Sequence, residues 1–403
     1  MANTKKYGVL LYGATGFTGK LTAAYLDQHP DLTDKRWAIA GRNAEALAAV
    51  RATLTSDQVD VVACSLDDPA AVESMVSSSK VVITTAGPYS LYQGDQLLGA
   101  CARLGVHYSD LSGEGFWQRE MIDAYHDVAR QSGSKIVLGG GVDSIPSDLG
   151  AYLALKGLGI KPQEDTYVQV TGKYTEYSGS FSGGTLASGR ARQAAIRSGR
   201  LTKDALHDPY ILAPGAQGSD REERTLDGMP PRFKQRYESG NGLLLPFFMG
   251  IINAPVVRRS LALAGVTEQV SYRECCAPVL WSRIAWLYAS RGLGFPLGQP
   301  IKFIPKSGEG PPPWLLKQGA FCVEVSAEAD DGRRVIATVS GKGDPGYGAT
   351  SKMLAELALC LMKDRRGVPR NSGVLTPASA LGDGLVTRLN AAQDGRFMNL
   401  ELS

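Results

Sequence analysis

The chain has 403 residues, of which 43% are hydrophobic and 21% are charged, and its formal net charge at pH 7 is +3. This composition excludes a disordered chain, and so small a net charge does not indicate nucleic-acid binding. The length predicts two domains, or one domain with a large insertion. The six cysteines include no C-x-x-C pair and the four histidines are scattered. We therefore expect reduced thiols, no metal site and, since no signal-peptide pattern follows Lys5 and Lys6, a cytoplasmic protein.

A glycine-rich turn near the N-terminus connects a predicted strand to a predicted helix. An apolar run ends at Gly13, and a helix-forming stretch begins just after Gly19. Glycine permits unusual φ angles and close approach of a phosphate, and the N–H groups of the following helix attract an anion. The spacing G-x-x-G-x-x-G therefore predicts a dinucleotide site, with an ordinary glycine-rich turn as the alternative. The candidate cofactor-binding residues of this turn are Gly13, Thr15, Gly16, Phe17, Thr18 and Gly19.

The end of the second predicted strand indicates which dinucleotide binds. NAD sites usually place Asp or Glu there, to accept a hydrogen bond from the ribose 2′-hydroxyl. Here the strand ends at Ala40 and Gly41 without a carboxylate, and Arg42 follows at once. A guanidinium suits a 2′-phosphate, so the sequence favours NADP(H) over NAD(H). The alternative is that Arg42 only caps a loop.

Predicted strands and helices alternate through the first 150 residues. We predict strands at 7–12, 36–41, 59–63, 80–85, 106–108 and 135–139, and helices at 18–29, 44–54, 69–77, 92–104, 116–132 and 147–157. This alternation is typical of an α/β protein with a doubly wound parallel sheet. Ligands of such sheets bind at the carboxyl ends of the strands, where three loops of this chain contain candidate residues.

The first loop, after the fourth strand, contains Ala86, Gly87, Pro88 and Tyr89. Gly-Pro turns the chain away from the strand, and Tyr89 is predicted to lie above the nicotinamide half of the cofactor. A structural turn is the alternative. Ala86, Gly87 and Pro88 complete the set of predicted cofactor-binding residues.

The other two loops follow the fifth and sixth strands. In the segment 106–114, Asp110 is interpreted equally well as a residue that takes part in the reaction and as a helix cap. Ser112 and Glu114 are better interpreted as caps of the next helix. The segment 139–148 opens with three glycines that let the backbone approach a ligand. Its Asp143 is interpreted as a residue that orients the chain.

The character of the sequence changes after residue 157. Alternating patterns at 167–172, 321–327 and 334–339 predict a sheet of antiparallel strands with a hairpin around 330–333. We divide the chain into a dinucleotide-binding domain at 1–157, an α+β substrate domain at 158–340 and a C-terminal part at 341–403. The last part should contain two helices, at 349–363 and 377–391, that lack strands of their own and pack back on the first domain.

Residues 241–300 form an apolar section broken by prolines. The section is rich in Trp, Phe and Leu, but it also carries the five arginines Arg258, Arg259, Arg273, Arg283 and Arg291. A closed core tolerates such charges poorly, whereas arginine stems lie readily along an apolar surface. The section is therefore predicted to cover a hydrophobic substrate, to contact a lipid or membrane surface peripherally, or to form a homodimer face. A buried core is the alternative.

Six motifs together resemble one enzyme family, the saccharopine dehydrogenase-like oxidoreductases. They lie at 13–19, 40–42, 86–89, 107–114, 182–185 and 343–347. Within that family the chain is most similar to the trans-acting enoyl reductase branch. The resemblance implies a Rossmann domain interrupted by a substrate domain, with the C-terminal helices rejoining the first domain. It also implies NADPH-dependent reduction of a carbon–carbon double bond in a polyketide or lipid acyl chain.

Two other functions remain open from the sequence. An imine reductase of saccharopine-reductase type would need cations for substrate carboxylates, and Arg190, Arg192, Arg197 and Arg200 lie on or near one predicted helix. A non-catalytic NADP-binding sensor or lipid-surface adaptor is the second alternative. For the reductase, Tyr89 is the predicted hydroxyl near the reacting atoms and Asp110 the predicted orienting group.

Overall fold

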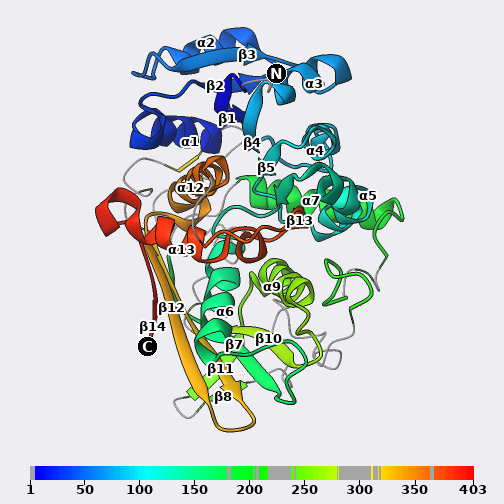
Figure 1. The fold of residues 1–403 in the computed structure, drawn as a ribbon, viewed down its shortest axis with the longest axis vertical. Helices are drawn as coiled ribbons and strands as arrows, with labels where there is room; N and C mark the ends of the chain where they lie inside the picture. Colours follow the sequence, from blue (N-terminus) through cyan, green and yellow to red (C-terminus); the bar gives the residue numbers. More distant parts are fainter. Residues whose placement is uncertain are drawn as a thin grey trace, which may run out of the picture.

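The computed structural model describes residues 5–178, 183–202, 205, 208–216, 237–239, 242–278, 280, 310–311, 316, 319–363 and 367–403. Their strands form two sheets, which we call sheet A and sheet B. In Figure 1 sheet A occupies the upper part of the molecule and sheet B the lower part, with the C-terminal helices between them.

Sheet A is parallel throughout and has the strand order β13-β6-β5-β4-β1-β2-β3. Its strands are β1 Tyr7–Tyr12, β2 Trp37–Gly41, β3 Val59–Ala63, β4 Ser79–Thr84, β5 His107–Ser109, β6 Lys135–Val137 and β13 Gly373–Leu375. The helices between its first six strands are α1 Phe17–Asp27, α2 Ala44–Arg51, α3 Pro69–Ser77, α4 Gly94–Leu104 and α5 Gly115–Ser132, and α6 Ile145–Leu158 follows β6. The predicted doubly wound α/β fold is confirmed.

Local signals explain why these elements lie within a few residues of the predicted ranges. The side chain of Asn43 accepts a hydrogen bond from Ala46 N at the start of α2, and that of Asp68 accepts one from Ala71 N at the start of α3. Gly105 and Gly133 end α4 and α5 with φ angles of +67° and +79°. Caps of both kinds are short-range patterns that a sequence displays directly.

Sheet B has the order β14-β12-β11-β7-β10-β9-β8. Its strands are β7 Val168–Ser178, β8 Tyr237–Ser239, β9 Gly242–Pro246, β10 Val270–Cys276, β11 Ala320–Ala329, β12 Arg334–Lys342 and β14 Met398–Leu402. The predicted hairpin is confirmed as β11 and β12. The prediction of an antiparallel sheet is wrong for one pair, because β10 runs parallel to β7. A parallel pair needs a long crossover, and α7 Gly183–Arg197 and α9 Gly250–Ala264 lie in this one.

The C-terminal part contributes a strand to each sheet, contrary to prediction. β13 pairs in parallel with β6, and β14 pairs with β12. Strands as short as β13 are hard to predict because three residues show no periodicity. The helix α12 Thr350–Met362 packs against α1 and against β1, β4 and β5, while α13 Pro377–Gly395 packs on α6, as Figure 1 shows.

Most of the apolar section that the structure describes, 242–278, is buried. Phe247, Val257 and Arg258 are fully buried, and Arg259 is 5% exposed. The prediction that these two arginines mark an interface is therefore wrong. Their charges meet carbonyl oxygens instead: Arg258 Nη2 donates to Tyr272 O at 2.8 Å, and Arg259 donates to Leu212 O and Val374 O.

The rest of the apolar section, 281–300, lies outside the described residues and contains Trp281, Arg283, Trp286 and Arg291. None of the helices that the structure describes has the length and apolar character of a membrane span.

Candidate functional site

The predicted dinucleotide turn lies between β1 and α1. Gly13 has a φ angle of +82°, and its carbonyl accepts a hydrogen bond from Gly16 N at 3.1 Å. Gly16 is the N-cap of α1 and provides no side-chain cap. The first N–H groups of a helix have no partner within it, so those of Phe17, Thr18 and Gly19 suit an anion such as pyrophosphate.

The three glycines of this turn have different surroundings. A Cβ atom at Gly19 would lie 2.2 Å from Gly13 O and 2.8 Å from Ala14 Cα, and one at Gly13 would lie 2.9 Å from Ala86 N. At Gly16 it would meet only Gly13 O, at 3.4 Å. Gly13 and Gly19 are thus required for packing, whereas Gly16 keeps open the space in front of the helix.

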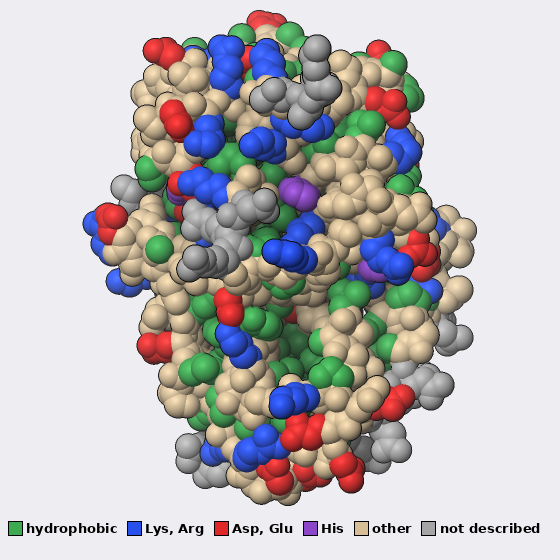
Figure 2. Space-filling view, in the orientation of Figure 1, with side chains coloured by type: hydrophobic (Ala, Val, Ile, Leu, Met, Phe, Trp, Pro, Cys, Tyr) green, Lys and Arg blue, Asp and Glu red, His purple; other side chains and the backbone are tan. Residues whose placement is uncertain are grey.

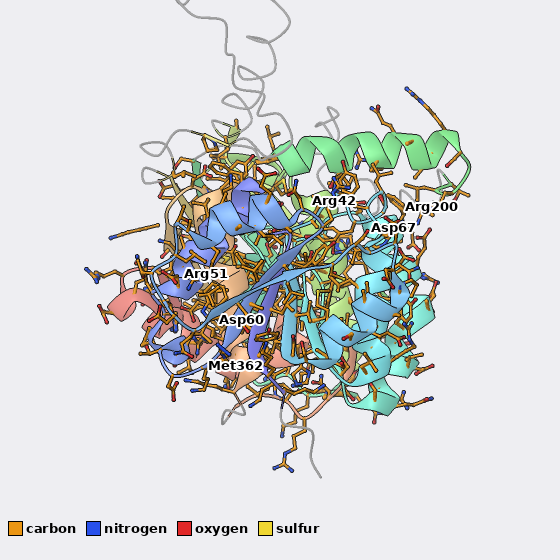
Figure 3. The ribbon with its side chains drawn as sticks, turned by 90° about the horizontal axis from the view of Figure 1, so that it is seen from above. Arg42, Arg51, Asp60, Asp67, Arg200 and Met362 are labelled. Atoms are coloured by element: carbon orange, nitrogen blue, oxygen red, sulfur yellow. The ribbon has the colours of Figure 1, made fainter. Side chains whose placement is uncertain are left out.

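Arg42 lies just beyond the carboxyl end of β2 and is exposed. Its charge helps to lower the pKa of Asp67, after the larger effects of hydrogen bonds from Gln93 and Ser65. Figure 3 shows Arg42 and Asp67 on the side of sheet A toward α7 and Arg200, away from Arg51 and Asp60. Because Gly13 N donates to Ala40 O at 2.9 Å, the end of β2 lies beside the dinucleotide turn, and the exposed guanidinium that follows it is accessible to a phosphate.

The loop after β4 is shaped by internal hydrogen bonds. Ala86 and Gly87 are partly exposed, and the peptide bond between Gly87 and Pro88 is cis. Tyr89 is 4% exposed; its hydroxyl donates to Thr84 O and accepts from Leu111 N, both at 3.0 Å. The hydroxyl thus ties the loop after β4 to the loop after β5. This geometry does not favour the predicted place of Tyr89 beside the reacting atoms.

Glu114 has a role that the sequence does not indicate. It is the N-cap residue of α5, but its side chain makes no capping bond. Its carboxylate accepts instead from Tyr89 N at 3.0 Å and from Ser90 N at 3.1 Å, and on the other side from Ser188 Oγ of α7 at 3.2 Å. Glu114 therefore positions the loop after β4, and the capping interpretation is wrong.

Asp110 joins the loops after β5 and β6. It is fully buried, and its carboxylate accepts from Tyr108 Oη, Ser112 N, Ser112 Oγ and Gly139 N at 2.7–3.2 Å. Burial raises the pKa of Asp110 to about 6, although these hydrogen bonds oppose the shift. The bond from Ser112 Oγ also shows that Ser112 supports Asp110 rather than capping α5. These contacts hold the loops after β5 and β6 together, and the orienting role of Asp110 in the reaction stays a prediction.

The loop after β6 runs close to several backbones. Gly140 N donates to Asp110 O, and a Cβ atom at Gly140 would lie 2.6 Å from Ser109 Oγ. Val142 N donates to Thr350 Oγ1 at 3.1 Å, so the start of α12 contacts this loop. Ser144, at its end, has a φ angle of +133°. No sequence pattern predicts this conformation for a serine.

A segment after β12 connects the dinucleotide turn to sheet B. It contains Pro345–Ala349, and Tyr347 packs edge-on against Phe17 with ring centroids 4.8 Å apart. A Cβ atom at Gly310 would also lie 2.2 Å from the Phe17 ring. Phe17 is therefore held by two segments from distant parts of the chain, which fixes the start of α1.

The arginines weighed for an imine reductase lie at the surface where they are described. Arg192 and Arg197 of α7 are exposed. Arg200 pairs with Glu120 through Nε at 2.8 Å and Nη2 at 2.6 Å. The side chain of Arg190 lies outside the described residues. The three described arginines of this group are exposed, which does not favour a closed pocket for substrate carboxylates formed by them.

Comparisons with known proteins show which proteins this chain is similar to. The family model of the saccharopine dehydrogenase NADP binding domain matches residues 9–137. A Mycobacterium tuberculosis protein provisionally named trans-acting enoyl reductase is 35% identical, with 97% of both chains covered. Relatives named trans-acting enoyl reductase from Mycobacterium ulcerans and Mycobacterium bovis are 34% identical, with 96% of each chain covered. Saccharopine dehydrogenase (L-Glu forming) from Saccharomyces cerevisiae aligns over 98% of this chain and 99% of its own, at 12% identity and a TM-score of 0.45.

The chain belongs to the saccharopine dehydrogenase-like oxidoreductases, and within them to the trans-acting enoyl reductase branch. It is an NADP-dependent oxidoreductase, so the predicted family, enzyme class and NADP(H) cofactor are confirmed. The individual contacts of the predicted cofactor-binding residues stay predictions.

Proposed function

We propose that this chain uses NADPH to reduce the carbon–carbon double bond of an enoyl thioester derived from a polyketide or lipid acyl chain. The similarity to relatives named trans-acting enoyl reductase carries this proposal, because it extends over nearly the full chain and includes sheet B. Apolar side chains at the surface of the molecule support this proposal. Figure 2 shows hydrophobic side chains at the surface in its lower half, where sheet B lies.

The residues of the site fit a bound NADPH, which would supply a hydride. The turn 13–19 would hold the pyrophosphate, and Arg42 the 2′-phosphate. Glu114 and Asp110 would keep the loops after β4, β5 and β6 in place, because buried carboxylates with several donors adopt one geometry. The substrate then gains a hydride at its β-carbon and a proton at its α-carbon, and the protein has to stabilise the enolate between the two steps.

A substrate panel tests the proposed function. NADPH oxidation is followed by its near-ultraviolet absorbance with enoyl thioesters, cyclic imines and keto compounds. We expect turnover with long-chain enoyl thioesters and none with the imines. Turnover of the imines alone would indicate the imine reductase. NADPH binding without turnover of any compound would indicate the sensor or adaptor.

The choice of cofactor gives a prediction for Arg42→Ala. Loss of one charge-assisted contact to the 2′-phosphate should weaken NADPH binding by about 1.5–3 kcal/mol and leave NADH binding nearly unchanged. Titration of both cofactors into the wild type and the variant measures the difference. Arg51→Ala is the matched control, since Arg51 donates to Val59 O, Leu54 O and Ser56 O on the side away from α7. An equal loss of affinity for NADPH and NADH in Arg42→Ala would show that Arg42 does not bind the 2′-phosphate.

The last part of the apolar section, 281–300, gives a further prediction. We propose that 281–300 contacts the hydrophobic substrate or a lipid surface, because this stretch is apolar and yet carries Arg283 and Arg291. Trp281→Ala and Trp286→Ala should weaken binding of long-chain substrate or liposomes with little change in melting temperature. Truncation of a buried aromatic residue would instead cost about 3–5 kcal/mol. A fall of many degrees without any binding defect would assign these residues to the core.

A further inference from the structure

The carboxylate of Glu114 joins parts of the chain that are far apart in the sequence. Glu114 is 3% exposed and accepts hydrogen bonds from the backbone N–H groups of Tyr89 and Ser90, at 3.0 and 3.1 Å. The hydroxyl groups of Ser90 and Ser188 also donate to it, that of Ser188 at 3.2 Å. A donor that moved away would leave part of this buried charge without a partner, which is costly. The loop after β4 and the helix α7 are therefore fixed by one side chain.

The loop after β4 lies directly beside the dinucleotide turn. Thr85 Oγ1 donates to Gly13 O at 3.1 Å, and a Cβ atom at Gly13 would lie 2.9 Å from Ala86 N. In sheet A, β1 has β4 on one side and β2 on the other, so the strand order reverses at β1. A dinucleotide binds in the crevice at such a point. A shift of the loop after β4 would therefore move a wall of the NADPH site.

The helix α7 follows a strand of sheet B but packs on sheet A. It comes directly after β7 in the order of elements. Ala195 of α7, and Leu201 just after it, lie in the same hydrophobic cluster as Trp117 of α5. Beyond the end of α7, Arg200 pairs with Glu120 of α5. Figure 1 shows α7 beside α5, so this helix links sheet B to the loops of sheet A.

The surroundings of Glu114 include a second helix of sheet B. A Cβ atom at Gly113 would lie 3.3 Å from Ile252 Cδ1 of α9, and α9 packs on β10. Arg259 of α9 donates to Leu212 O, in the segment that follows α7. Glu114 therefore lies where both helices of the crossover between β7 and β10 meet sheet A.

We propose that Ser188 is a positioning residue, which couples the place of α7 to the place of the loop after β4 through Glu114. A displacement of α7 withdraws one donor from the carboxylate, and the anchor of the loop is then no longer fixed. A substrate that binds against α7 or sheet B is thereby coupled to NADPH. The inference rests on the proposed function where an enoyl thioester is that substrate.

The direction of the Ser188 hydroxyl distinguishes this contact from ordinary helix packing. A serine in a helix commonly donates to a carbonyl oxygen one turn earlier, as Ser198 does to Ala195 O at 3.1 Å. Ser188 donates to another element instead. The pair of Arg200 with Glu120 is partly exposed, and exposed pairs contribute little. Of these two polar contacts, the one between Ser188 and Glu114 therefore determines the place of α7 more strongly.

The first test measures the Kd of NADPH without substrate. In Ser188→Ala we expect it to rise about 3–10-fold, as for loss of one hydrogen bond, with an unchanged melting temperature. Ser188→Thr keeps the hydroxyl and should retain the wild-type Kd. In Glu114→Gln we expect a rise of about 10-fold or more, because the amide group cannot accept from all four donors. Ser198→Ala is the matched control, since its hydroxyl contacts only its own helix in the described structure.

The double variant shows whether the two residues act together. If Ser188 acts through Glu114, the double variant should bind NADPH no more weakly than Glu114→Gln alone. With an enoyl thioester and saturating NADPH, we expect kcat to fall about 10-fold in Ser188→Ala at an unchanged KM, because the nicotinamide is then misplaced. A residue that only stabilised the fold would not separate kcat from KM in this way.

The outcomes separate this inference from the proposed function. If Ser188→Ala binds NADPH as tightly as the wild type, the coupling is refuted, and the proposed function stands if the wild type reduces the thioester. If the melting temperature of Ser188→Ala falls and the two substitutions are additive, the contact only holds α7 in place and the coupling is equally refuted. If the wild type reduces no enoyl thioester but the Kd values follow the expected pattern, the proposed function fails and the coupling stands. If Glu114→Gln does not fold, the comparison of Ser188→Ala with Ser188→Thr decides.

Discussion

A chain with valine at position 16 is expected to fold normally and to lose NADPH binding. Gly16 has φ −70° and ψ 165°, an extended conformation that valine adopts readily, and its Cβ would meet only Gly13 O at 3.4 Å. The added methyl groups would project into the space in front of α1, where the pyrophosphate would bind. Loss of two charge-assisted hydrogen bonds of about 1.5–3 kcal/mol each would lower the affinity about 100-fold or more.

Circular dichroism, melting temperature and a cofactor titration distinguish loss of binding from loss of fold. Gly19→Ala is the contrasting variant, because its Cβ would lie 2.2 Å from Gly13 O and the backbone would have to move. We expect Gly19→Ala to lower both melting temperature and affinity, and Gly16→Val to lower affinity alone. Retained binding in Gly16→Val would show that the glycines only form a turn.

The sequence predicts sheet A well because its information is local. Strand periodicity, the caps at Asn43 and Asp68 and the glycines that end helices all act within a few residues. The sequence does not predict β13 and β14, because these short segments become strands only by pairing with residues far away in the chain. Leu375, for example, pairs with Val137.

Residue types at the carboxyl edge were easier to predict than the directions of their side chains. The loop after β4 lies at this edge, but the hydroxyl of Tyr89 turns inward to Thr84 and Leu111. Glu114 holds that loop from 25 residues away, so no short motif reveals it.

A buried cluster of charges fastens α1 and the turn that follows it to the C-terminal helices. Arg388 of α13 pairs with Glu356 of α12, with Nε and Oε2 2.5 Å apart, and donates from Nη1 to Asp31 at 2.8 Å. Glu356 also contacts Tyr25 Oη at 2.5 Å and His29 Nε2 at 3.2 Å. The side chains of Arg388 and Glu356 are only 4% and 1% exposed. The predicted return of the C-terminal helices to the first domain is thus made partly through an ionic contact.

Arg388→Ala should destabilise the fold by about 3–5 kcal/mol, because it leaves the Glu356 carboxylate buried without its main countercharge. Burial alone raises the pKa of Glu356, but the hydrogen bond from His29 and the charge of Arg388 outweigh it and hold the pKa below its ordinary value. A lowered folded-state pKa contributes stability above the unfolded pKa of about 4.3 and loses it as pH falls through the folded value. The wild type loses this contribution in acid, whereas the variant has already lost it at neutral pH. The gap in melting temperature between the wild type and the variant should therefore be large at pH 7 and smaller near pH 4.

Arg396→Ala is the matched control, since Arg396 is 76% exposed and its pair with Asp394 is worth only about 0–1 kcal/mol. If both substitutions lowered the melting temperature at pH 7 by the same small amount, apolar packing of α12, and not this charge cluster, would be what holds α1 to the C-terminal part.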